Sequence, residues 1–212
     1  TSARAAEWLV VLQSLNPPPA PAALGRPHPP PPAVIWDAHL ANIRRHGREL
    51  ADAYPAESRA IGRLAASLLD RLGSPREPLV ASHGDLHPKN LLIDGEVVTA
   101  VDFDTFARRE PAFDVGYAIG ELLIMSLLRL GDASPGSTAA AAFWFRYREL
   151  GGTANPDRVA LHVGRTFLQS LHYELCVLRN SRDELLRRWP ELAWEWMDSD
   201  GLAPLEGALR HR

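Results

Sequence analysis

A tight β-hairpin is the structural element that the sequence predicts most specifically. The tripeptide Asp-Gly-Glu at 94–96 lies between two short apolar runs, residues 91–93 and 97–101, and this pattern is typical of a hairpin. Asn90 precedes the first strand and Asp102 follows the second. Any short-turn register therefore brings these two side chains to one end of the hairpin, offset by about one to three residues of roughly 3.3 Å each.

The octapeptide before the hairpin, His-Gly-Asp-Leu-His-Pro-Lys-Asn, has the features of a catalytic loop. Its Gly84 and Pro88 disfavour a regular helix there. Phosphoryl transfer from ATP requires a group that orients the attacking hydroxyl and a magnesium ion held against the phosphates. Asp85 is suited to accept the proton of that hydroxyl. Oxygen atoms of Asn90 and Asp102 are ligands of the kind that magnesium prefers.

The rest of the chain has mainly helical periodicity, so the predicted fold class is α+β, dominated by helices around the hairpin. A strand is also expected at residues 79–81, leading into the octapeptide. Residues 17–32 hold nine prolines and predict a linker or a long surface loop. The expected helices cover residues 3–15, 36–50 with an interruption near Gly47, 61–72, 114–130 with Asp114 as N-cap, 138–150, a segment capped by Asn155, and a last one opened by a Ser181–Glu184 capping box.

Three motifs together resemble the aminoglycoside phosphotransferase and choline kinase family, whose members have a protein-kinase-like fold. They are the octapeptide ending at Asn90, Val-Asp-Phe-Asp at 101–104, and Phe-Asp-Val-Gly at 113–116. The resemblance implies that Asp85 is the catalytic base, that Asn90 and Asp102 bind Mg²⁺, and that ATP is the co-substrate. It also implies a structural role for Asp114, which would bond back to the catalytic loop.

The resemblance covers only the C-terminal lobe of that family. Nothing before residue 79 predicts the strands, glycine-rich loop or lysine of the N-terminal β lobe, and Lys89 is the only lysine among 23 basic residues. The helix at residues 3–15 resembles the one that follows the hinge between the lobes. We therefore expect a fragment whose N-terminal lobe is supplied by missing upstream sequence. Its parts would be residues 1–16 after the hinge, a proline-rich linker at 17–34, and the kinase-like C-terminal lobe at 35–212.

Four further polar residues are candidates for supporting roles at the site. His83 is expected to pack and fix the loop, and His87 to lie in the loop near the site. Lys89 is either a phosphate-binding residue or a solvated side chain. Asp104 either supports the metal site or ends the strand.

Acidic and aromatic residues near the C-terminus are candidates for substrate binding. Glu191, Glu195 and Asp198 are interspersed with tryptophans, and such a wall attracts a cation by charge and by cation–π contact. The alternative is an amphipathic helix with its tryptophans inward and its acids in water. The first interpretation predicts a cationic hydroxyl compound as the substrate.

Composition argues against several other classes of partner. The net charge of -3, with scattered charges, argues against a nucleic acid. No apolar run approaches the roughly 20 residues that span a bilayer. The single cysteine, Cys176, excludes an internal disulfide and a multi-cysteine zinc site. A cytoplasmic location is the expectation that follows.

The predicted function is ATP- and Mg²⁺-dependent transfer of the γ-phosphoryl group to a hydroxyl of a small molecule. Whether this chain alone is active stays open. One alternative is a metal-dependent hydrolase with His83, Asp85 and His87 as ligands, since two histidines four residues apart can share a metal on a helix. Another is a non-catalytic binding module derived from a kinase. The sequence does not identify the phosphate acceptor.

Overall fold

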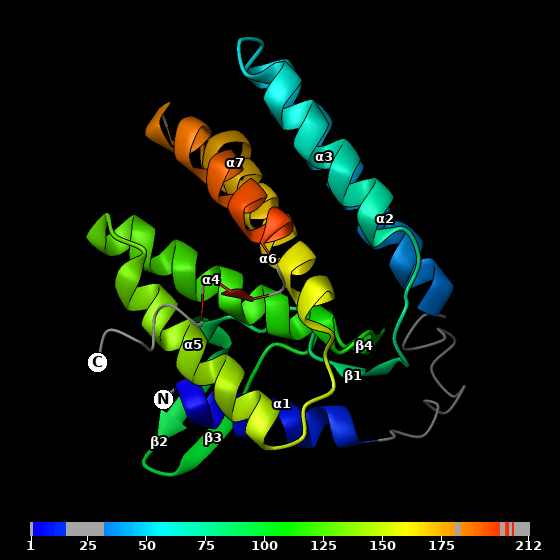
Figure 1. The fold of residues 1–212 in the computed structure, drawn as a ribbon, viewed down its shortest axis with the longest axis vertical. Helices are drawn as coiled ribbons and strands as arrows, with labels where there is room; N and C mark the ends of the chain where they lie inside the picture. The colour runs from blue at the N-terminus through cyan, green and yellow to red at the C-terminus, as the bar shows by residue number, and fades with distance from the viewer. Residues whose placement is uncertain (1, 16–31, 181–182, 200–201, 204, 206–212) are drawn as a thin grey trace.

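The computed structural model describes residues 2–15, 32–180, 183–199, 202–203 and 205. Helices dominate this part of the chain, and its strands form two small antiparallel sheets (Figure 1). The predicted α+β class is thus confirmed. The helices are α1 (Ser2–Ser14), α2 (Pro32–Ala53), α3 (Ser58–Leu72), α4 (Ala112–Leu130), α5 (Ser134–Glu149), α6 (Pro156–His172) and α7 (Asp183–Asp198). The strands are β1 (Val80–Ser82), β2 (Leu91–Asp94), β3 (Val97–Ala100) and β4 (Ala107–Arg109), with a 3₁₀ turn at Pro88–Asn90 and a π-helical turn at Tyr173–Val177.

Strands β2 and β3 form the predicted hairpin. Asp94 pairs with Val97, so residues 95 and 96 make the turn, and Gly95 adopts the positive φ of 54° that such turns favour. At the open end, the main-chain N–H of Val101 donates to the carbonyl of Asn90 at 3.0 Å. Asp102 therefore lies one residue beyond the position opposite Asn90, within the offset that the sequence predicts.

A second sheet pairs β1 with β4, which sequence periodicity does not indicate. Val80 lies opposite Arg109 and Ser82 opposite Ala107. The Ala-Arg-Arg sequence of β4 has neither the β-branched residues nor the alternation that identify a strand. After the hairpin, this pairing returns the chain to the start of the octapeptide. The octapeptide therefore lies next to the segment that joins β3 to β4.

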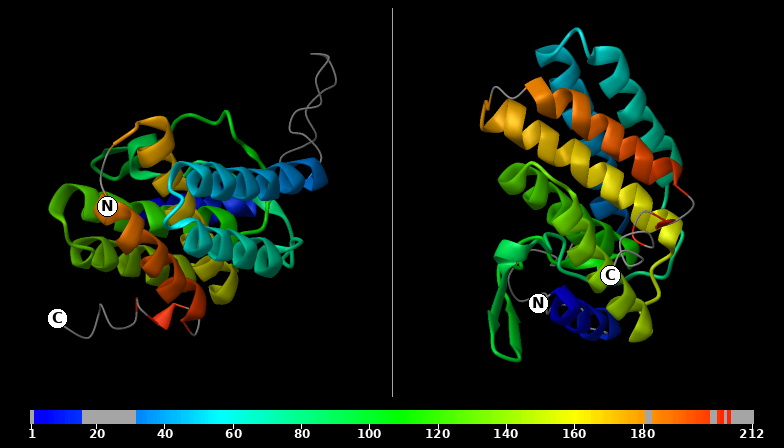
Figure 2. Two further views of the ribbon diagram at one scale, coloured as in Figure 1. Left: turned by 90° about the horizontal axis from the view of Figure 1, so that it is seen from above. Right: turned by 60° about the vertical axis from the view of Figure 1, so that its left-hand side comes forward.

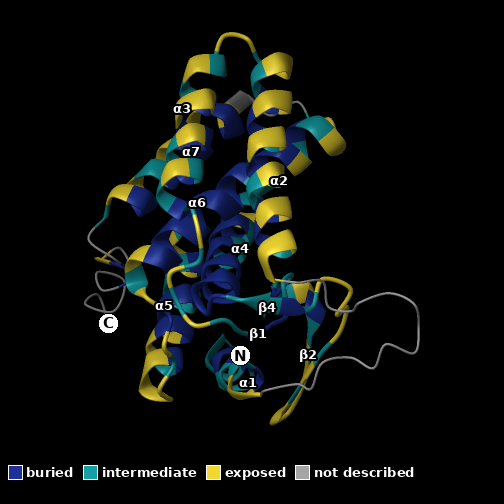
Figure 3. Ribbon diagram, turned by 90° about the vertical axis from the view of Figure 1, so that its right-hand side faces the viewer, coloured by how far each residue is buried: buried dark blue, intermediate teal, exposed yellow. Residues whose placement is uncertain are grey.

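Helices α4 and α6 form the buried centre of the helical part (Figure 3). They can approach closely because glycines on α4 face α6: a Cβ added to Gly116 would lie 2.4 Å from Cβ of His162. Around this pair lie α5 on one side and the α2–α3 pair with α7 on the other (Figures 1 and 2). Large side chains such as Phe143, Phe167 and Trp189 fill the core between these layers.

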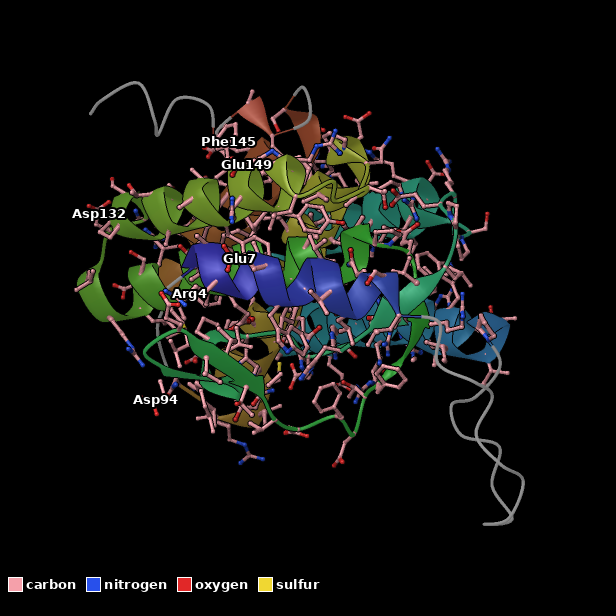
Figure 4. All side chains as sticks on the ribbon, turned by 90° about the horizontal axis from the view of Figure 1, so that it is seen from below. Arg4, Glu7, Asp94, Asp132, Phe145 and Glu149 are labelled. Carbon is pink, nitrogen blue, oxygen red and sulfur yellow. The ribbon has the colours of Figure 1, made fainter. Side chains whose placement is uncertain are left out.

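Helix α1 lies between the hairpin and α5, and ion pairs tie it to both. Arg4 contacts Glu96 at 3.0 Å, and Glu7 contacts Arg146 at 2.7 Å (Figure 4). The apolar face of α1, with Leu9 fully buried, packs in the core. These ion pairs are partly exposed, so burial of the apolar face contributes more to the position of α1 than the charges do.

Several predicted boundaries differ in the structure. The expected interruption of the second helix is wrong, because α2 continues through Gly47, which packs against Ala65 of α3. Asp114 is not the N-cap of α4, which begins at Ala112. Asn155 is confirmed as the cap of α6, since its side chain accepts the amides of residues 157 and 158.

Other predictions concern the linker and the last helices. Helix α5 begins at Ser134, four residues before the predicted start. Helix α2 begins at Pro32, so residues 32–34 are helical and do not belong to a linker, while residues 16–31 lie outside the described residues. Ser181 of the predicted capping box also lies outside them. Within the described ranges, no helix combines the length and the apolarity needed to cross a bilayer.

Candidate active site

The octapeptide leaves β1 as a loop that the carboxylate of Asp114 holds in place. Asp114, on the first turn of α4, is fully buried. It accepts the Ser82 hydroxyl at 3.0 Å, the main-chain N–H of His83 at 2.8 Å and that of Gly84 at 2.9 Å. A buried carboxylate needs such donors, because an unpaired buried charge is costly. The backbone leading to Asp85 is thereby fixed to the central helix.

His83 packs in the loop, and backbone groups occupy both of its ring nitrogens. Nε2 lies 3.0 Å from the carbonyl of Val101, and Nδ1 accepts the N–H of Asp85 at 3.3 Å. The ring also lies against Phe103, with centroids 4.6 Å apart. Neither nitrogen is available to a metal, and no group of three His, Cys, Asp or Glu side chains within the described ranges is arranged to hold one. The geometry does not support the hydrolase alternative.

Gly84 is a position that only glycine fits without strain. Its φ is +87°, in the region that disfavours side chains. A Cβ at this position would lie 2.5 Å from the carbonyl of Thr105 and 2.6 Å from Nη1 of Arg109. The Thr105 hydroxyl in turn donates to the carbonyl of His83 at 2.9 Å. The catalytic loop is thus packed directly against the segment that joins the hairpin to β4.

Asp85 follows Gly84, and its side chain is 32% exposed. The side-chain amide of Asn90 donates to the main-chain oxygen of Asp85 at 3.0 Å and approaches its Oδ2 at 3.4 Å. Nε2 of His87 lies 3.7 Å from the same Oδ2. Tyr117 of α4 lines the second cavity together with this carboxylate. Asn90 and His87 therefore flank the carboxylate while one part of it stays open to solvent.

Two side chains at the open end of the hairpin carry oxygen atoms: Asn90 next to this carboxylate, and Asp102 one residue beyond the position opposite Asn90. The side-chain nitrogen of Asn90 donates hydrogen bonds to Asp85. Its side-chain oxygen is not used in those bonds and can serve as a ligand atom. Asp102 is exposed and has a φ of 65°, a left-handed conformation that aspartate tolerates better than most residues. Positive φ at a non-glycine residue concentrates at functional sites. The arrangement offers amide and carboxylate oxygens of the kind that hard cations take.

The comparisons with known proteins agree with this geometry. The model of the phosphotransferase enzyme family matches residues 2–162. The chain belongs to this family. Among solved structures, a choline/ethanolamine kinase family protein from Mesorhizobium loti superposes with a TM-score of 0.61 at 18% identity, covering 100% of this chain and 67% of that one. An aminoglycoside phosphotransferase from Alicyclobacillus acidocaldarius matches at 14% identity with a TM-score of 0.46, covering 99% of this chain and 65% of the other.

The match to the family model establishes the family, and the superposition on the choline/ethanolamine kinase family protein establishes the kinase-like fold. The chain spans about two thirds of the length of the two solved structures. No protein with curated function matches the sequence. The resemblance to aminoglycoside phosphotransferases and choline kinases is thus confirmed at the level of the family.

In this phosphotransferase, two cavities meet at Asp85. The first, of about 520 Å³, lies between α2, α6 and the segment leading into β4. The second, of about 610 Å³, extends along α4 and the end of α6. His46 and Gln169 line both cavities, as Asp85 does. Volumes of several hundred Å³ are typical of small-molecule sites. A bound compound in either cavity would have access to the carboxylate.

The candidates for supporting roles are divided between these cavities. His87 and Lys89 line the second, and Asp104 lines the first. The main-chain N–H of Lys89 donates to Nδ1 of His87, and this bond starts the 3₁₀ turn. Burial lowers the pKa of His87, so its imidazole is neutral at pH 7. The Lys89 side chain is exposed.

The acidic residues of α7 are not brought to this site. Glu191, Glu195 and Asp198 are all exposed, and none of them lines either cavity that contains Asp85. Asp198 instead pairs with Arg71 of α3 at 3.1 Å. The buried face of α7 carries Trp189 and Trp196, as the amphipathic alternative predicts. A substrate-binding role for these acids therefore stays a prediction, and it does not involve the two cavities at Asp85.

Sequence reasoning missed two residues of α4 at the site. Tyr117 and Glu121 both line the second cavity. Burial, together with the charges of Glu121 and Asp85, raises the pKa of Tyr117, so its hydroxyl keeps its proton. Burial also raises the pKa of Glu121. The signal was available in the helical spacing, because residues three and seven positions after Asp114 lie on the same face of α4.

Proposed function

We propose that this chain carries the catalytic groups of an ATP- and Mg²⁺-dependent kinase of a small-molecule hydroxyl. The observation that carries the proposal is the bond from the Asn90 amide to Asp85 at 3.0 Å, combined with the hairpin bond between Val101 and Asn90 at 3.0 Å. These bonds support a site in which a partly exposed carboxylate acts together with side-chain oxygens of Asn90 and Asp102. Phosphoryl transfer from ATP requires this combination of groups.

Asp85 would orient the acceptor hydroxyl and take its proton. The surrounding donors hold the carboxylate in one position, which is the main contribution that an enzyme makes to such a reaction. Tyr117 lines the same cavity as Asp85, and burial raises its pKa, so its hydroxyl keeps its proton and does not compete with Asp85 as a base. The exposed part of the carboxylate is left for the acceptor.

Asn90 and Asp102 would hold Mg²⁺ through their side-chain oxygens. Magnesium in kinases is bound by one or two protein groups together with substrate phosphates and waters, so two oxygen donors fit this ion without a complete protein cage. When bound, the ion would neutralise charge that develops on the transferred phosphoryl group. The positive φ of Asp102 sets the direction of its side chain at the end of the hairpin.

The nucleotide would lie over the outward face of the hairpin. Leu92 is 58% exposed, Val97 63% and Val101 37%, and alternation places them on one face of β2 and β3. Exposed apolar side chains gathered on one face indicate a binding surface. We propose that this face receives ATP together with an N-terminal β lobe, since the chain spans only about two thirds of its solved relatives.

Incubation of the full-length protein with ATP, Mg²⁺ and a panel of small hydroxyl compounds tests the proposal. We expect one class of compound to become phosphorylated, with one ADP formed for each product molecule, and no product when Mg²⁺ is chelated. Mass spectrometry of the products and an ADP assay measure both quantities. ATP binding without any phosphorylated acceptor, or no ATP binding, would instead favour the non-catalytic binding module.

A further inference from the structure

Arg109 of β4 and Arg165 of α6 line the first cavity beside Asp85, and within the described ranges neither forms an ion pair with a carboxylate. We propose that these two arginines bind an anionic group, a carboxylate or a phosphate, on the acceptor whose hydroxyl meets Asp85. The inference rests on the proposed kinase function, because it identifies the class of acceptor for that same site. It differs from the expectation of a cationic acceptor, whose candidate acids on α7 do not line the cavities at Asp85.

Arg165 is the stronger indication, because it is a buried cation that forms no ion pair with a carboxylate of the described residues, and the charges of Asp114 and Glu121 act on it only from longer range. Its side chain lies over the rings of Phe113 and Tyr117, 4.5 Å and 5.1 Å from their centroids. Its hydrogen bonds go to neutral groups, Gln169 at 3.1 Å and Thr166 at 3.4 Å, and its Nε has no partner. The residue is only 5% exposed. A buried charge of this kind is costly unless an opposite charge accompanies it.

The pKa of Arg165 reflects this situation. Burial and, to a lesser degree, the charge of Arg109 lower the pKa to about 10, while the charges of Asp114 and Glu121 act in the opposite direction. The guanidinium still carries its charge at pH 7 and has donors that no described carboxylate accepts. An anion in the adjoining cavity would supply the missing counter-charge.

Arg109 faces the same ring from the other wall of the cavity. Its guanidinium carbon lies 4.7 Å from the centroid of Phe113, and Nη1 donates to the carbonyl of Thr105 at 2.9 Å. A Cβ added at Gly84 would also lie 2.6 Å from this Nη1 atom. The charge of Arg109 is therefore held against the backbone just before Asp85. Its Nε is buried without a hydrogen-bond partner.

A third buried nitrogen atom without a hydrogen-bond partner lies in the same cavity. His39 of α2 is 9% exposed, and its Nε2 has no hydrogen-bond partner. Its ring packs on Phe113, with centroids 5.1 Å apart. Among the described residues, Nε2 of His39 and Nε of both arginines are thus three of the buried nitrogen atoms that lack partners. A polar ligand accounts for such a concentration better than packing does.

The carboxylates that line this cavity do not neutralise the arginines. They are Asp85 and Asp104, and neither forms an ion pair with Arg109 or Arg165 within 4.0 Å. Asp85 must stay available to the hydroxyl, and Asp104 lies on an exposed turn. The second cavity is also lined by both signs of charge, since Glu121, Glu174, Arg45 and Lys89 belong to it. The first cavity differs in that its two arginines have buried Nε atoms without hydrogen-bond partners.

The anion belongs to the acceptor and not to ATP. Asn90, Lys89 and Asp102 do not line the first cavity. The phosphates of ATP accompany the metal ligands, so they approach Asp85 from another side. A compound that places its hydroxyl at Asp85 from this cavity has its remaining atoms beside the arginines.

Binding of a matched set of two-carbon alcohols to this chain tests the inference. Glycolate, ethylene glycol and ethanolamine share a hydroxyl and differ in carrying a carboxylate, a second hydroxyl or an ammonium group. NMR titration gives their dissociation constants, with inorganic phosphate as a second anionic probe. We expect glycolate to bind about tenfold more tightly than either other alcohol, as one charge-assisted contact implies. If phosphate alone binds, the site recognises a phosphate group. Equal binding of all the probes, or preference for ethanolamine, would overturn the inference.

Arginine variants connect the preference to the two side chains. Arg165→Met and Arg109→Met should each weaken glycolate binding about tenfold. Arg48→Met removes the same charge from an exposed position on α2 and should leave binding unchanged. Arg165→Lys controls for misfolding of the methionine variant. It keeps the positive charge, so it should bind glycolate more tightly than Arg165→Met does. Equal affinities in wild type and in the folded Arg109 and Arg165 variants would contradict the assignment.

Asp85→Asn separates this inference from the proposed function. The substitution removes a negative charge beside the cavity, so glycolate should bind as tightly as in wild type or more tightly. Kinase turnover should be lost in the same variant. If turnover persists while the arginine variants lose glycolate, the proposed function fails and the anion site stands. If turnover is lost in Asp85→Asn while the arginine variants bind glycolate as wild type does, the proposed function stands and the anion site fails.

Discussion

Oδ1 of Asp114 accepts the main-chain N–H of Gly84 at 2.9 Å, so a side chain of the central helix α4 fixes the backbone immediately before Asp85. The other oxygen of Asp114 accepts the N–H of His83 at 2.8 Å. The position of the catalytic loop therefore depends on one buried carboxylate, and the core that holds α4 also holds the candidate base.

Asp114→Asn should destabilise the protein strongly. Asparagine offers only one acceptor oxygen, and its NH₂ group would face a main-chain N–H in a buried site. Loss of charge-assisted bonds and a buried donor without a partner imply a decrease of about 2–4 kcal/mol in the free energy of unfolding. Urea denaturation measures it. Asp52→Asn, at an exposed position of α2, should change stability by less than about 0.5 kcal/mol. Equal effects in both variants would contradict the anchoring role.

Gly84→Ala and Gly95→Ala form a matched pair at positive φ. Both residues must keep a strained backbone, but only at Gly84 would the added Cβ meet atoms, the nearest at 2.5 Å, whereas nothing lies within 4 Å at Gly95. Gly95→Ala should cost about 1 kcal/mol from backbone strain alone, and Gly84→Ala about 2 kcal/mol more. Thermal unfolding compares the two. A smaller loss for Gly84→Ala would show that the loop is not packed against Thr105 and Arg109.

The free energy of unfolding should fall as the pH decreases from 6.5 to 4. His162 is fully buried, and burial lowers its pKa to about 4 from an ordinary value of 6.5. In this interval the unfolded chain binds a proton that the folded protein does not, so acid favours unfolding. The shift corresponds to a loss on the order of 2–3 kcal/mol for this residue. Urea denaturation at a series of pH values measures the slope.

His162→Gln identifies the group responsible. Nε2 of His162 lies 2.8 Å from Glu110, which also pairs with Arg158 at 2.7 Å. Glutamine retains a donor that can reach Glu110 but does not titrate. The variant should lose much of the decrease between pH 6.5 and 4. An unchanged slope would assign the pH dependence to other buried groups.

The Asn90 and Asp102 side chains should determine metal affinity in the full-length protein with ATP bound. Mn²⁺ can replace Mg²⁺ at oxygen sites, and its paramagnetic relaxation of water protons reports binding without requiring turnover. Asp102→Asn and Asn90→Ala should each weaken Mn²⁺ binding by about tenfold or more, because each removes a ligand. Retained affinity in both variants would place the metal elsewhere.

The hairpin could be predicted from sequence because its signals are local. A turn sequence between two apolar runs defines the register, and Asn90 and Asp102 follow from it. The cap Asn155 was equally clear, since its role depends on the next two residues. The prediction of an interruption at Gly47 is wrong, because this glycine lets α2 pack closely against Ala65 of α3, a residue far away in the sequence.

The rest of the site depends on contacts that local patterns do not contain. Arg109 lies on a strand that forms only by pairing with β1, and Arg165 lies on a helix more than seventy residues after Gly84. The roles of Tyr117 and Asp114 required the position of α4 relative to the loop. The position of the α7 acids also depends on packing, because their composition suits a substrate wall and an amphipathic helix equally well. Only the packed structure shows which face of α7 is buried.

Turnover of Asp85→Asn in the full-length protein is the most direct test of the central claim. The substitution preserves size and removes the group that orients the hydroxyl and accepts its proton. We predict that kcat falls by a factor of about 10²–10⁴, while the dissociation constant for Mg²⁺–ATP stays close to the wild-type value. Wild-type turnover in Asp85→Asn would contradict the account.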